Sequence, residues 1–278
     1  PRYYAKYTGL NSLSTKEEIK TTLTSTLFLS ARLWKHGYVI VNPEMAGGEG
    51  VSEARGIAGF TNGESFRVGD PKPVIYLARG VFHQYFSLGK GKQFNEDDIN
   101  TVADSIPQKY IHVVAGKFCL SDYFDANSYS HDPREQFLNW SLMSNGAWDY
   151  AANTRGYTHA VMLEAVTPKL SLRAAFALLP TYANGPVLNP DISKSRSMQV
   201  ELEKSFQLFG HASLAHVLVF QNAAGMFNYK TITPHVSDSL FNADDYRKST
   251  RKKLGVGLNI ETALNPNSGI FFRAGWND

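Results

Sequence analysis

The sequence alternates between apolar and polar side chains over much of its length, and this period of two restricts the fold more than any other feature. From Leu170 to Leu178 every even position is apolar, while the odd positions carry Ser171, Arg173 and two alanines. From Lys253 to Glu261 the even positions are again apolar, and the odd ones are polar or glycine. Because successive side chains of a β-strand point to opposite faces, this pattern predicts strands with one apolar and one polar face.

The alternation predicts ten strands and therefore an all-β, antiparallel protein. The strands are expected at residues 22–33, 38–45, 73–87, 109–120, 157–167, 170–178, 198–205, 212–224, 253–261 and 270–276. No internal repeat, low-complexity segment or linker interrupts them, so residues 1–278 are expected to form a single domain.

The connections between these strands alternate in length. Short links fall at 34–37, 167–169, 209–211 and 264–268, and long ones at 46–72, 121–156, 181–195 and 225–250. Short turns on one side and long loops on the other are typical of an up-and-down transmembrane barrel, so the long loops are expected to share the cell exterior. The link 88–108 breaks the rhythm, because it belongs to the short side but is long and carries the acidic patch Glu96–Asp98.

A soluble antiparallel sandwich would show the same alternation. Two features favour the membrane barrel. The strands are about ten residues long, which suits a tilted membrane span, and aromatic residues near strand ends could form the girdles of such a barrel. These aromatic residues are Trp34, Tyr38, Tyr110, Tyr157 and Trp276. The longest apolar run, Ala174–Leu179, is far shorter than the roughly 20 residues of a membrane-spanning helix.

Composition excludes several classes of function. The chain has 28 Lys and Arg against 25 Asp and Glu, too even a balance for a protein that binds nucleic acid by bulk charge. Cys119 is the single cysteine, so an internal disulfide and a cysteine-cluster metal site are excluded. The zinc-helix HExxH, the nucleophile elbow GxSxG and the phosphate-binding GxxxxGK[ST] motifs are absent, and no cofactor or metal is expected.

Segment 121–156 holds the densest set of charged and aromatic residues. Asp132 followed by Pro133 predicts a capped helix start, and Gly146 is a fitting end. Apolar residues in so long a loop need a surface to pack on, so we expect the segment to fold inward and narrow a pore. Paired carboxylates here could alternatively serve glycoside hydrolysis, although nothing in the sequence fixes their separation.

Four stretches resemble a known family. They are 42–44 with 50–69 (including GIAGF at 56–60), 116–125 with Gly116-Lys117-Phe118, the long stretch 130–157 with HDPREQFLNWSLMSNGAWDYAANTRGY, and 255–259 with 272–278. In these stretches the chain resembles the carbohydrate-selective outer-membrane porins of Gram-negative bacteria, the OprB-like family. The resemblance implies a sixteen-stranded barrel in the outer membrane, contact with lipid, small carbohydrates as passive permeants, no nucleic acid, and a possible homo-oligomer.

Ten strands are fewer than sixteen, and no terminal aromatic residue follows the last one. The chain is therefore expected to be a fragment that lacks C-terminal strands and some N-terminal sequence.

A sugar porin needs a wall that mixes hydrogen-bond donors and acceptors, because sugar hydroxyls are both. Trp148 is the candidate for stacking on a sugar ring, and Arg134 and Arg155 could pair with Glu164 or Glu201. The full set of candidate pore-lining or sugar-contacting residues is Arg32, Glu44, Arg79, Lys117, Asp122, Asp125, Arg134, Trp148, Arg155, Glu164, Arg173, Glu201 and Arg273. Each charge could instead form a salt bridge that only supports the wall.

The alternation also predicts facing: Leu172, Phe176, Leu254 and Leu258 toward lipid, and Arg173 and Glu261 toward water. A general diffusion pore and a soluble sugar-binding sandwich remain as alternative functions.

Overall fold

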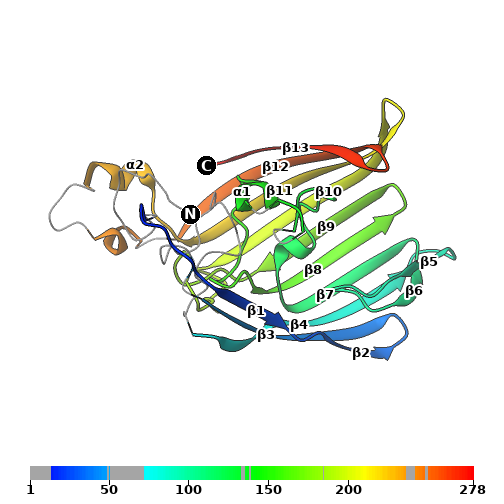
Figure 1. Cartoon of the computed structure of the whole chain (residues 1–278), viewed down its shortest axis with the longest axis horizontal. Helices are drawn as coiled ribbons and strands as arrows, with labels where there is room; N and C mark the ends of the chain where they lie inside the picture. The colour runs from blue at the N-terminus through cyan, green and yellow to red at the C-terminus, as the bar shows by residue number, and fades with distance from the viewer. Residues whose placement is uncertain are drawn as a thin grey trace.

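The computed structural model of the chain describes residues 14–48, 50, 72–132, 135–137, 139–183, 185–235, 242–247 and 250–278. It contains one large, curved antiparallel sheet (Figure 1). The strands of this sheet are β1 (Thr22–Thr26), β2 (Leu29–Trp34), β3 (Gly37–Gly48), β4 (Val74–Ser87), β7 (Tyr110–Phe118), β8 (Thr158–Thr167), β9 (Leu170–Ala177), β10 (Arg196–Leu208), β11 (His211–Gly225), β12 (Thr250–Asn265) and β13 (Ser268–Asn277).

The strands follow one another in chain order, as in an up-and-down sheet. Both β1 and β2 pair with β3, β1 along Glu44–Gly48 and β2 along Gly37–Val41, so together they trace one broken strand. The sheet therefore has the ten strand paths that the alternation predicts, and the antiparallel all-β class is confirmed. In the described part of the chain, β1 and β2 at one edge and β13 at the other pair with a single neighbour each.

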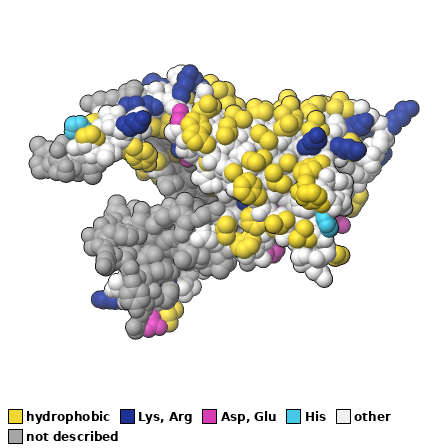
Figure 2. All heavy atoms as spheres, turned by 90° about the horizontal axis from the view of Figure 1, so that it is seen from above, with side chains coloured by type: hydrophobic (Ala, Val, Ile, Leu, Met, Phe, Trp, Pro, Cys, Tyr) yellow, Lys and Arg dark blue, Asp and Glu magenta, His cyan; other side chains and the backbone are white. Residues whose placement is uncertain are grey.

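The polarity of the two faces is the opposite of that in a soluble protein, because charged side chains are buried on one face and apolar side chains are exposed on the other. On the face that we call inner, Arg173, Glu201 and Glu261 are buried, whereas Leu172 and Leu254 on the outer face are 48% and 43% exposed. Hydrophobic side chains gather over much of the face that Figure 2 shows. The predicted division between the two faces is confirmed, with Phe176 and Leu258 half-buried on the outer side. Arg173 and Glu261, predicted to face water, are instead buried.

The five residues predicted to form an aromatic girdle divide between the two faces of the sheet. Trp34 and Trp276 are exposed, as a lipid-facing girdle requires. Tyr38 and Tyr157, in contrast, are buried on the inner side, and Tyr110 packs against Tyr85 there. These residues do lie at or next to strand ends, as predicted. The three tyrosines face the inner side, however, so their predicted place in a girdle is wrong.

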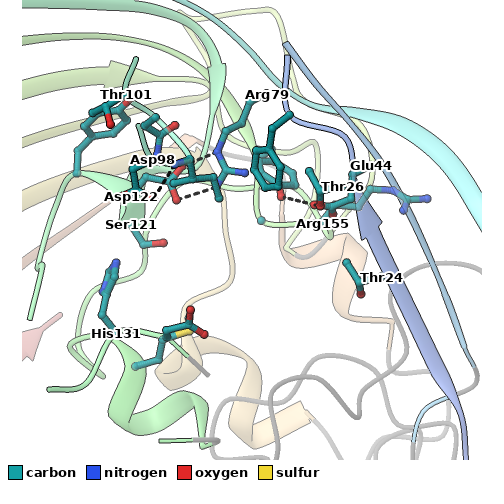
Figure 3. Close-up of a pocket in the computed structure, with 18 of the residues that line it drawn as sticks. Thr24, Thr26, Glu44, Arg79, Asp98, Thr101, Ser121, Asp122, His131 and Arg155 are labelled. Atoms are coloured by element: carbon teal, nitrogen blue, oxygen red, sulfur yellow. Dashed lines mark hydrogen bonds and ion pairs between the residues drawn. The ribbon is translucent and has the colours of Figure 1, made fainter. Parts of the chain in front are cut away.

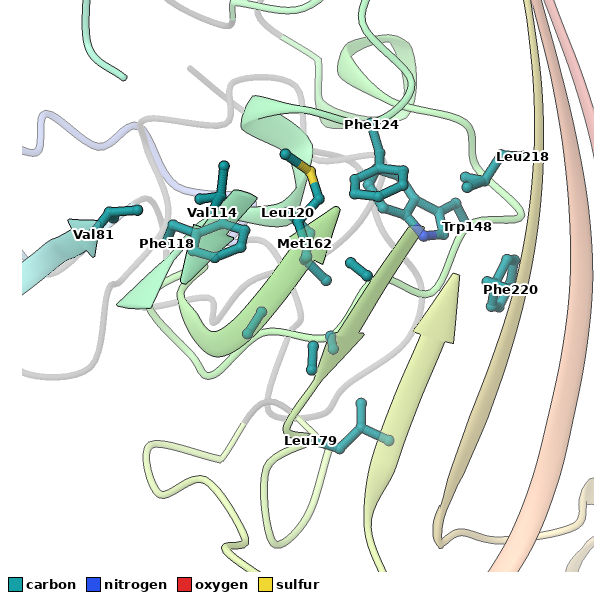
Figure 4. Packing of buried hydrophobic residues seen from close by; sticks show 14 residues of the cluster. Val81, Val114, Phe118, Leu120, Phe124, Trp148, Met162, Leu179, Leu218 and Phe220 are labelled. Carbon is teal, nitrogen blue, oxygen red and sulfur yellow. The ribbon is translucent and has the colours of Figure 1, made fainter. Parts of the chain in front are cut away.

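The inward segment, which we define as residues 119–157 between β7 and β8, lies against the inner face. Its residues Phe124 and Trp148 pack with Met162 of β8 and with Leu218 and Phe220 of β11 in one buried cluster (Figure 4). The prediction that this segment folds inward is confirmed. Phe124 and Trp148 are removed from water by packing on the wall, whereas Phe137 and Leu142 are exposed.

In the described residues of the inward segment, helical structure is limited to two short turns, η2 (Leu120–Asp122) and α1 (Trp140–Met143). The predicted start at Pro133 and Arg134 lies outside the described residues. Beside it, the Gln136 side chain accepts from the backbone N–H of His131 and Asp132 and donates to the Ser128 carbonyl at 2.8 Å. Among the described residues, the helix predicted to run on to Gly146 is found only as α1.

The 121–156, 181–195 and 225–250 loops leave one edge of the sheet and the short turns leave the other (Figure 1). Most of the predicted 46–72 loop lies outside the described residues, and the placement of the long loops at the cell exterior stays a prediction. The loop between β11 and β12 carries α2 (Tyr229–Ile232), η3 (Thr233–His235) and η4 (Ala243–Tyr246). The 88–109 link, on the short-turn edge, forms a separate hairpin of β5 (Lys92–Asn95) and β6 (Asp104–Pro107). None of the helices in the described ranges is both long and apolar enough to span a membrane.

Candidate functional site

A cavity of about 610 Å³ lies on the inner side of the sheet (Figure 3). Three parts of the chain enclose it: the wall formed by β1, β3, β4, β7 and β8, the inward segment, and the 88–109 link. Its lining is mostly polar and aromatic. The side chains that carry its chemistry are Thr24, Thr26, Glu44, Tyr76, Arg79, Asp98, Asn100, Thr101, Tyr110, Asp122, His131, Arg155, Tyr157 and Glu164.

Arg79 and Asp122 form the firmest polar contact of the cavity. The Arg79 Nε and Nη2 atoms donate to the two carboxylate oxygens of Asp122 at 2.8 and 2.9 Å. This bidentate geometry fixes the orientation of both side chains. The Arg79 guanidinium also lies 5.3 Å from the centre of the Tyr157 ring. The pair joins strand β4 to η2 and so ties the start of the inward segment to the wall.

Glu44 is the centre of a second cluster. Its carboxylate accepts from Thr26 Oγ1 at 2.9 Å, from the Tyr157 hydroxyl at 3.2 Å, and from the Tyr76 hydroxyl. The Arg155 guanidinium lies over the Tyr76 ring, 3.9 Å from its centre. This part of the cavity therefore combines an acceptor, hydroxyl groups and a cation beside aromatic rings.

A bulge in β4 is the reason that Tyr76 and Arg79 both face the cavity. Asn42 pairs with Arg79 and Pro43 with Leu77, so Ala78 is the extra residue. The extra residue reverses the parity of the strand, which turns Tyr76 inward and leaves Ile75 73% exposed on the outer face.

Across the rest of the inner face, charged side chains bind the inward segment. Arg173 donates to Glu164, Glu201 and Glu203 at 2.9, 2.7 and 2.8 Å, and also to the Tyr123 carbonyl at 2.7 Å. Glu201 in turn accepts the Asp125 N–H at 2.7 Å. The network crosses β8, β9 and β10 and ends on the segment.

A similar arrangement holds the segment to β12 and β13. Arg273 pairs with the Asp125 carboxylate at 3.1 Å and donates to the Ser130 and Leu142 carbonyls at 3.0 and 2.6 Å. Glu261 accepts from the Ser128 N–H at 2.7 Å. Burial raises the pKa of Asp125, while Arg273 and the Asn145 N–H act in the opposite direction. The polar groups of these residues therefore hydrogen-bond or ion-pair within the protein and hold the segment, and they do not face open solvent.

The predicted residues thus divide into groups. Glu44, Arg79, Asp122, Arg155 and Glu164 line the cavity. Arg173, Glu201 and Arg273 bind the inward segment, Glu201 and Arg273 through Asp125 of the segment itself, which agrees with the supporting role left open for each charge.

Four further candidates lie elsewhere. Trp148 is 5% exposed in the apolar cluster, so its ring offers no free face and the stacking role predicted for it is wrong. Lys117 is not among the cavity residues and pairs in register with exposed His159 of β8. Arg32 pairs with Asp104 of the 88–109 link at 3.2 Å. Arg134 lies outside the described residues.

The pairing predicted for Arg155 is also corrected, because its guanidinium lies on Tyr76 while Glu164 and Glu201 are held by Arg173. Sequence reasoning did not place Tyr76, Tyr157, Asp98 or Asn100 at the site. Two sequence signals could have pointed to some of them: the order of inward and outward residues along β4, and the unusual length of the 88–109 link.

Comparison with known proteins gives one informative match. No protein-family model and no curated protein matches the sequence. The high-pH structure of OprB from Pseudomonas putida superimposes with a TM-score of 0.61, covering 93% of this chain and 60% of the OprB chain. The two proteins share a fold. Their sequence identity is 14%, so the match extends to the fold alone, and this chain spans about 60% of the length of OprB.

Proposed function

We propose that this chain forms part of an outer-membrane porin through which small solutes, preferentially carbohydrates, diffuse passively. The reversed sheet is the observation that carries the proposal. Buried Arg173, Glu201 and Glu261 alternate with exposed apolar side chains such as Leu172 and Leu254. In water this arrangement would be unfavourable, because exposed apolar surface costs about 25 cal/mol per Å². In a bilayer the same surface contacts acyl chains, and the polar face lines a wet interior.

The free edges of the sheet fit this proposal only if other strands complete a barrel. Each backbone group left unpaired in lipid costs several kcal/mol, and a closed barrel removes both edges. The sixteen strands implied by the resemblance to OprB-like porins would supply the missing partners. A soluble sugar-binding sandwich is disfavoured, since a sandwich packs apolar inner faces together, whereas here charged residues such as Arg173 and Glu201 are buried on the inner face and the outer face is largely apolar.

The cavity chemistry supports a preference for sugars. Sugar hydroxyls both donate and accept, and the cavity offers carboxylates, guanidinium groups and hydroxyls close to one another. Its charges are largely matched, as in the Arg79–Asp122 pair, which favours neutral polar solutes over ions. Tyr76 and Tyr157 supply ring faces beside these groups. Such contacts are individually weak, and weak contacts permit rapid passage.

Liposome swelling with the complete gene product tests the proposal. Sugars are expected to enter faster than amino acids of similar size. Equal rates would indicate a general diffusion pore, and no swelling with folded, inserted protein would contradict the channel itself. A large dextran, which the pore should exclude, is the control for leaky liposomes. Partitioning into detergent provides a separate check, because a soluble lectin would stay in the aqueous phase.

A further inference from the structure

The 88–109 link leaves the short-turn edge of the sheet, where residues 88–94 are exposed, and its later part then folds back against the inner face. Its neck continues the pairing of β4 with β7, with Leu88 N–H bonded to the Lys109 carbonyl at 2.8 Å and Gln108 N–H to the Gly91 carbonyl at 3.0 Å. Beyond the neck, the β5–β6 hairpin folds back so that Ile106 is 2% exposed among Tyr38, Ile40 and Tyr85 of the inner face.

Polar contacts fix the hairpin in this position. Asp104 pairs with Arg32 of β2 at 3.2 Å, and Arg32 also donates to the Ala103 carbonyl at 2.9 Å. The Tyr38 hydroxyl donates to the Asn100 carbonyl at 3.3 Å. Three strands of the wall therefore hold the hairpin by an apolar contact, an ion pair and hydrogen bonds, which together give it a defined place inside the sheet's curve.

The hairpin tip is internally braced. Asp98 and Thr101 exchange backbone hydrogen bonds at 3.2 Å, Thr101 Oγ1 donates to the Glu96 carbonyl at 2.8 Å, and Asp97 accepts the Ala103 N–H at 2.5 Å. A tip of this kind presents its side chains in fixed positions. Asp98 and Thr101 are among the residues that line the cavity, together with Asp122 and Arg79 (Figure 3).

One tip residue presents an exposed charge to the cavity. Asp98 lines the cavity, is exposed, and uses one carboxylate oxygen to accept the Ile99 N–H at 2.7 Å. Asn100 also lines the cavity, but it is buried and its side-chain oxygen is enclosed by the protein.

We infer that the β5–β6 hairpin is a second constriction element, facing the inward segment across the cavity, and that Asp98 is a specificity-determining residue for the solute. This rests on the proposed porin function and adds to it an element from the opposite edge of the sheet. The Asp98 carboxylate disfavours anions. Asp122 and Glu164 repel anions less, because Arg79 and Arg173 neutralise them.

Cysteine modification during single-channel recording tests this inference. The complete gene product with Cys119→Ser is the background, and Asp98→Cys is compared with Ser105→Cys. Ser105 is the matched control, since it lies on the same hairpin, is exposed, and is not among the cavity residues. A bulky methanethiosulfonate reagent is expected to cause a stepwise loss of conductance in Asp98→Cys and none in Ser105→Cys. Asp98→Asn, without reagent, is expected to lower the ratio of cation to anion permeability.

The outcomes separate the two proposals. Channels that open normally in the background protein but do not respond to reagent at either position overturn the hairpin's role and leave the porin function standing. Equal loss at both positions also overturns it, because the effect would then not depend on the cavity. Absence of any channel from folded background protein overturns the porin function, and the inference with it. Folding of each variant is checked by the mobility shift that barrels show on unheated gels.

Discussion

Arg173 shows how a single side chain can organise the inner face. It lies on β9 with 9% of its side chain exposed, and it contacts carboxylates on both neighbouring strands as well as the inward segment. Three carboxylates around one guanidinium would repel each other strongly if that cation were removed from so buried a position. The residue is therefore a support for the wall and the segment rather than a contact for the solute.

Replacing Arg173 with Met is expected to destabilise the protein strongly. Removing one partner from a buried ion-pair network costs about 3–5 kcal/mol, because the remaining charges stay buried without compensation. Equilibrium unfolding by urea in lipid vesicles measures the loss. Lys204→Met on the adjacent β10 is the control, since Lys204 is exposed, and it should change the free energy of unfolding little. A similarly small effect for Arg173→Met would mean that the network does not form.

At the scale of elements, the inward segment determines what the inner face can do. Its contacts with β9 to β13 pair polar groups that would otherwise be hydrated in an open lumen. The cavity lies on the other side of the inner face, against β1 to β8. A solute that crosses the sheet's inner side would therefore pass along β3, β4 and β7.

Replacing residues 126–150 by a short Gly/Ser link is expected to enlarge the conductance of the complete gene product and weaken its discrimination among sugars. The wall charges freed by the change would become hydrated, so the barrel itself should still fold. Planar-bilayer recording provides the measurement. An equivalent replacement of 229–247 is the control, because the described part of that loop contributes no residue to the cavity. If the two variants conducted alike, the segment would not be a constriction.

The alternation predicts strands well because, in a sheet with one apolar and one polar face, apolar and polar residues must alternate along each strand. All ten strand paths were found in this way, although β10 and β12 extend beyond 198–205 and 253–261, where the alternation lapses. The site was harder to predict. Trp148 and Tyr76 show the difficulty, because an aromatic side chain in a loop can pack or face a solute equally well, and an unseen bulge changes the facing of every residue beyond it.

At the scale of the whole molecule, the up-and-down order places alternate connections on opposite edges, and this makes sidedness testable. Val187, 61% exposed in the loop between β9 and β10, and Asn267, exposed in the turn between β12 and β13, lie on opposite edges. Burial raises the pKa of the Cys119 thiol to about 11, which keeps it protonated near neutral pH and limits its background reaction.

In intact cells an impermeant maleimide is expected to label Val187→Cys but not Asn267→Cys, and to label both once the outer membrane is permeabilised. The reason is that long loops of a barrel face outward and short turns face the periplasm. Unmodified protein, with Cys119 alone, gives the background. Labelling of Asn267→Cys alone in intact cells would reverse the proposed orientation, and labelling of both would indicate that the sheet does not separate two compartments.

The reversed sheet makes a final, quantitative prediction that distinguishes a membrane barrel from any soluble arrangement. Leu258 lies near the middle of β12, paired with Val217, and faces the outer side, whereas Leu264 lies near the end of the same strand and is 45% exposed. In a bilayer, Leu258→Arg should cost about 2–4 kcal/mol because the charge sits near the midplane, and Leu264→Arg about 0–1 kcal/mol because it reaches the interface. Unfolding titrations of the complete gene product in lipid vesicles measure both. On a soluble sheet, an exposed leucine on either site could be replaced by arginine at little cost, so two small and equal effects would contradict a lipid-facing outer surface.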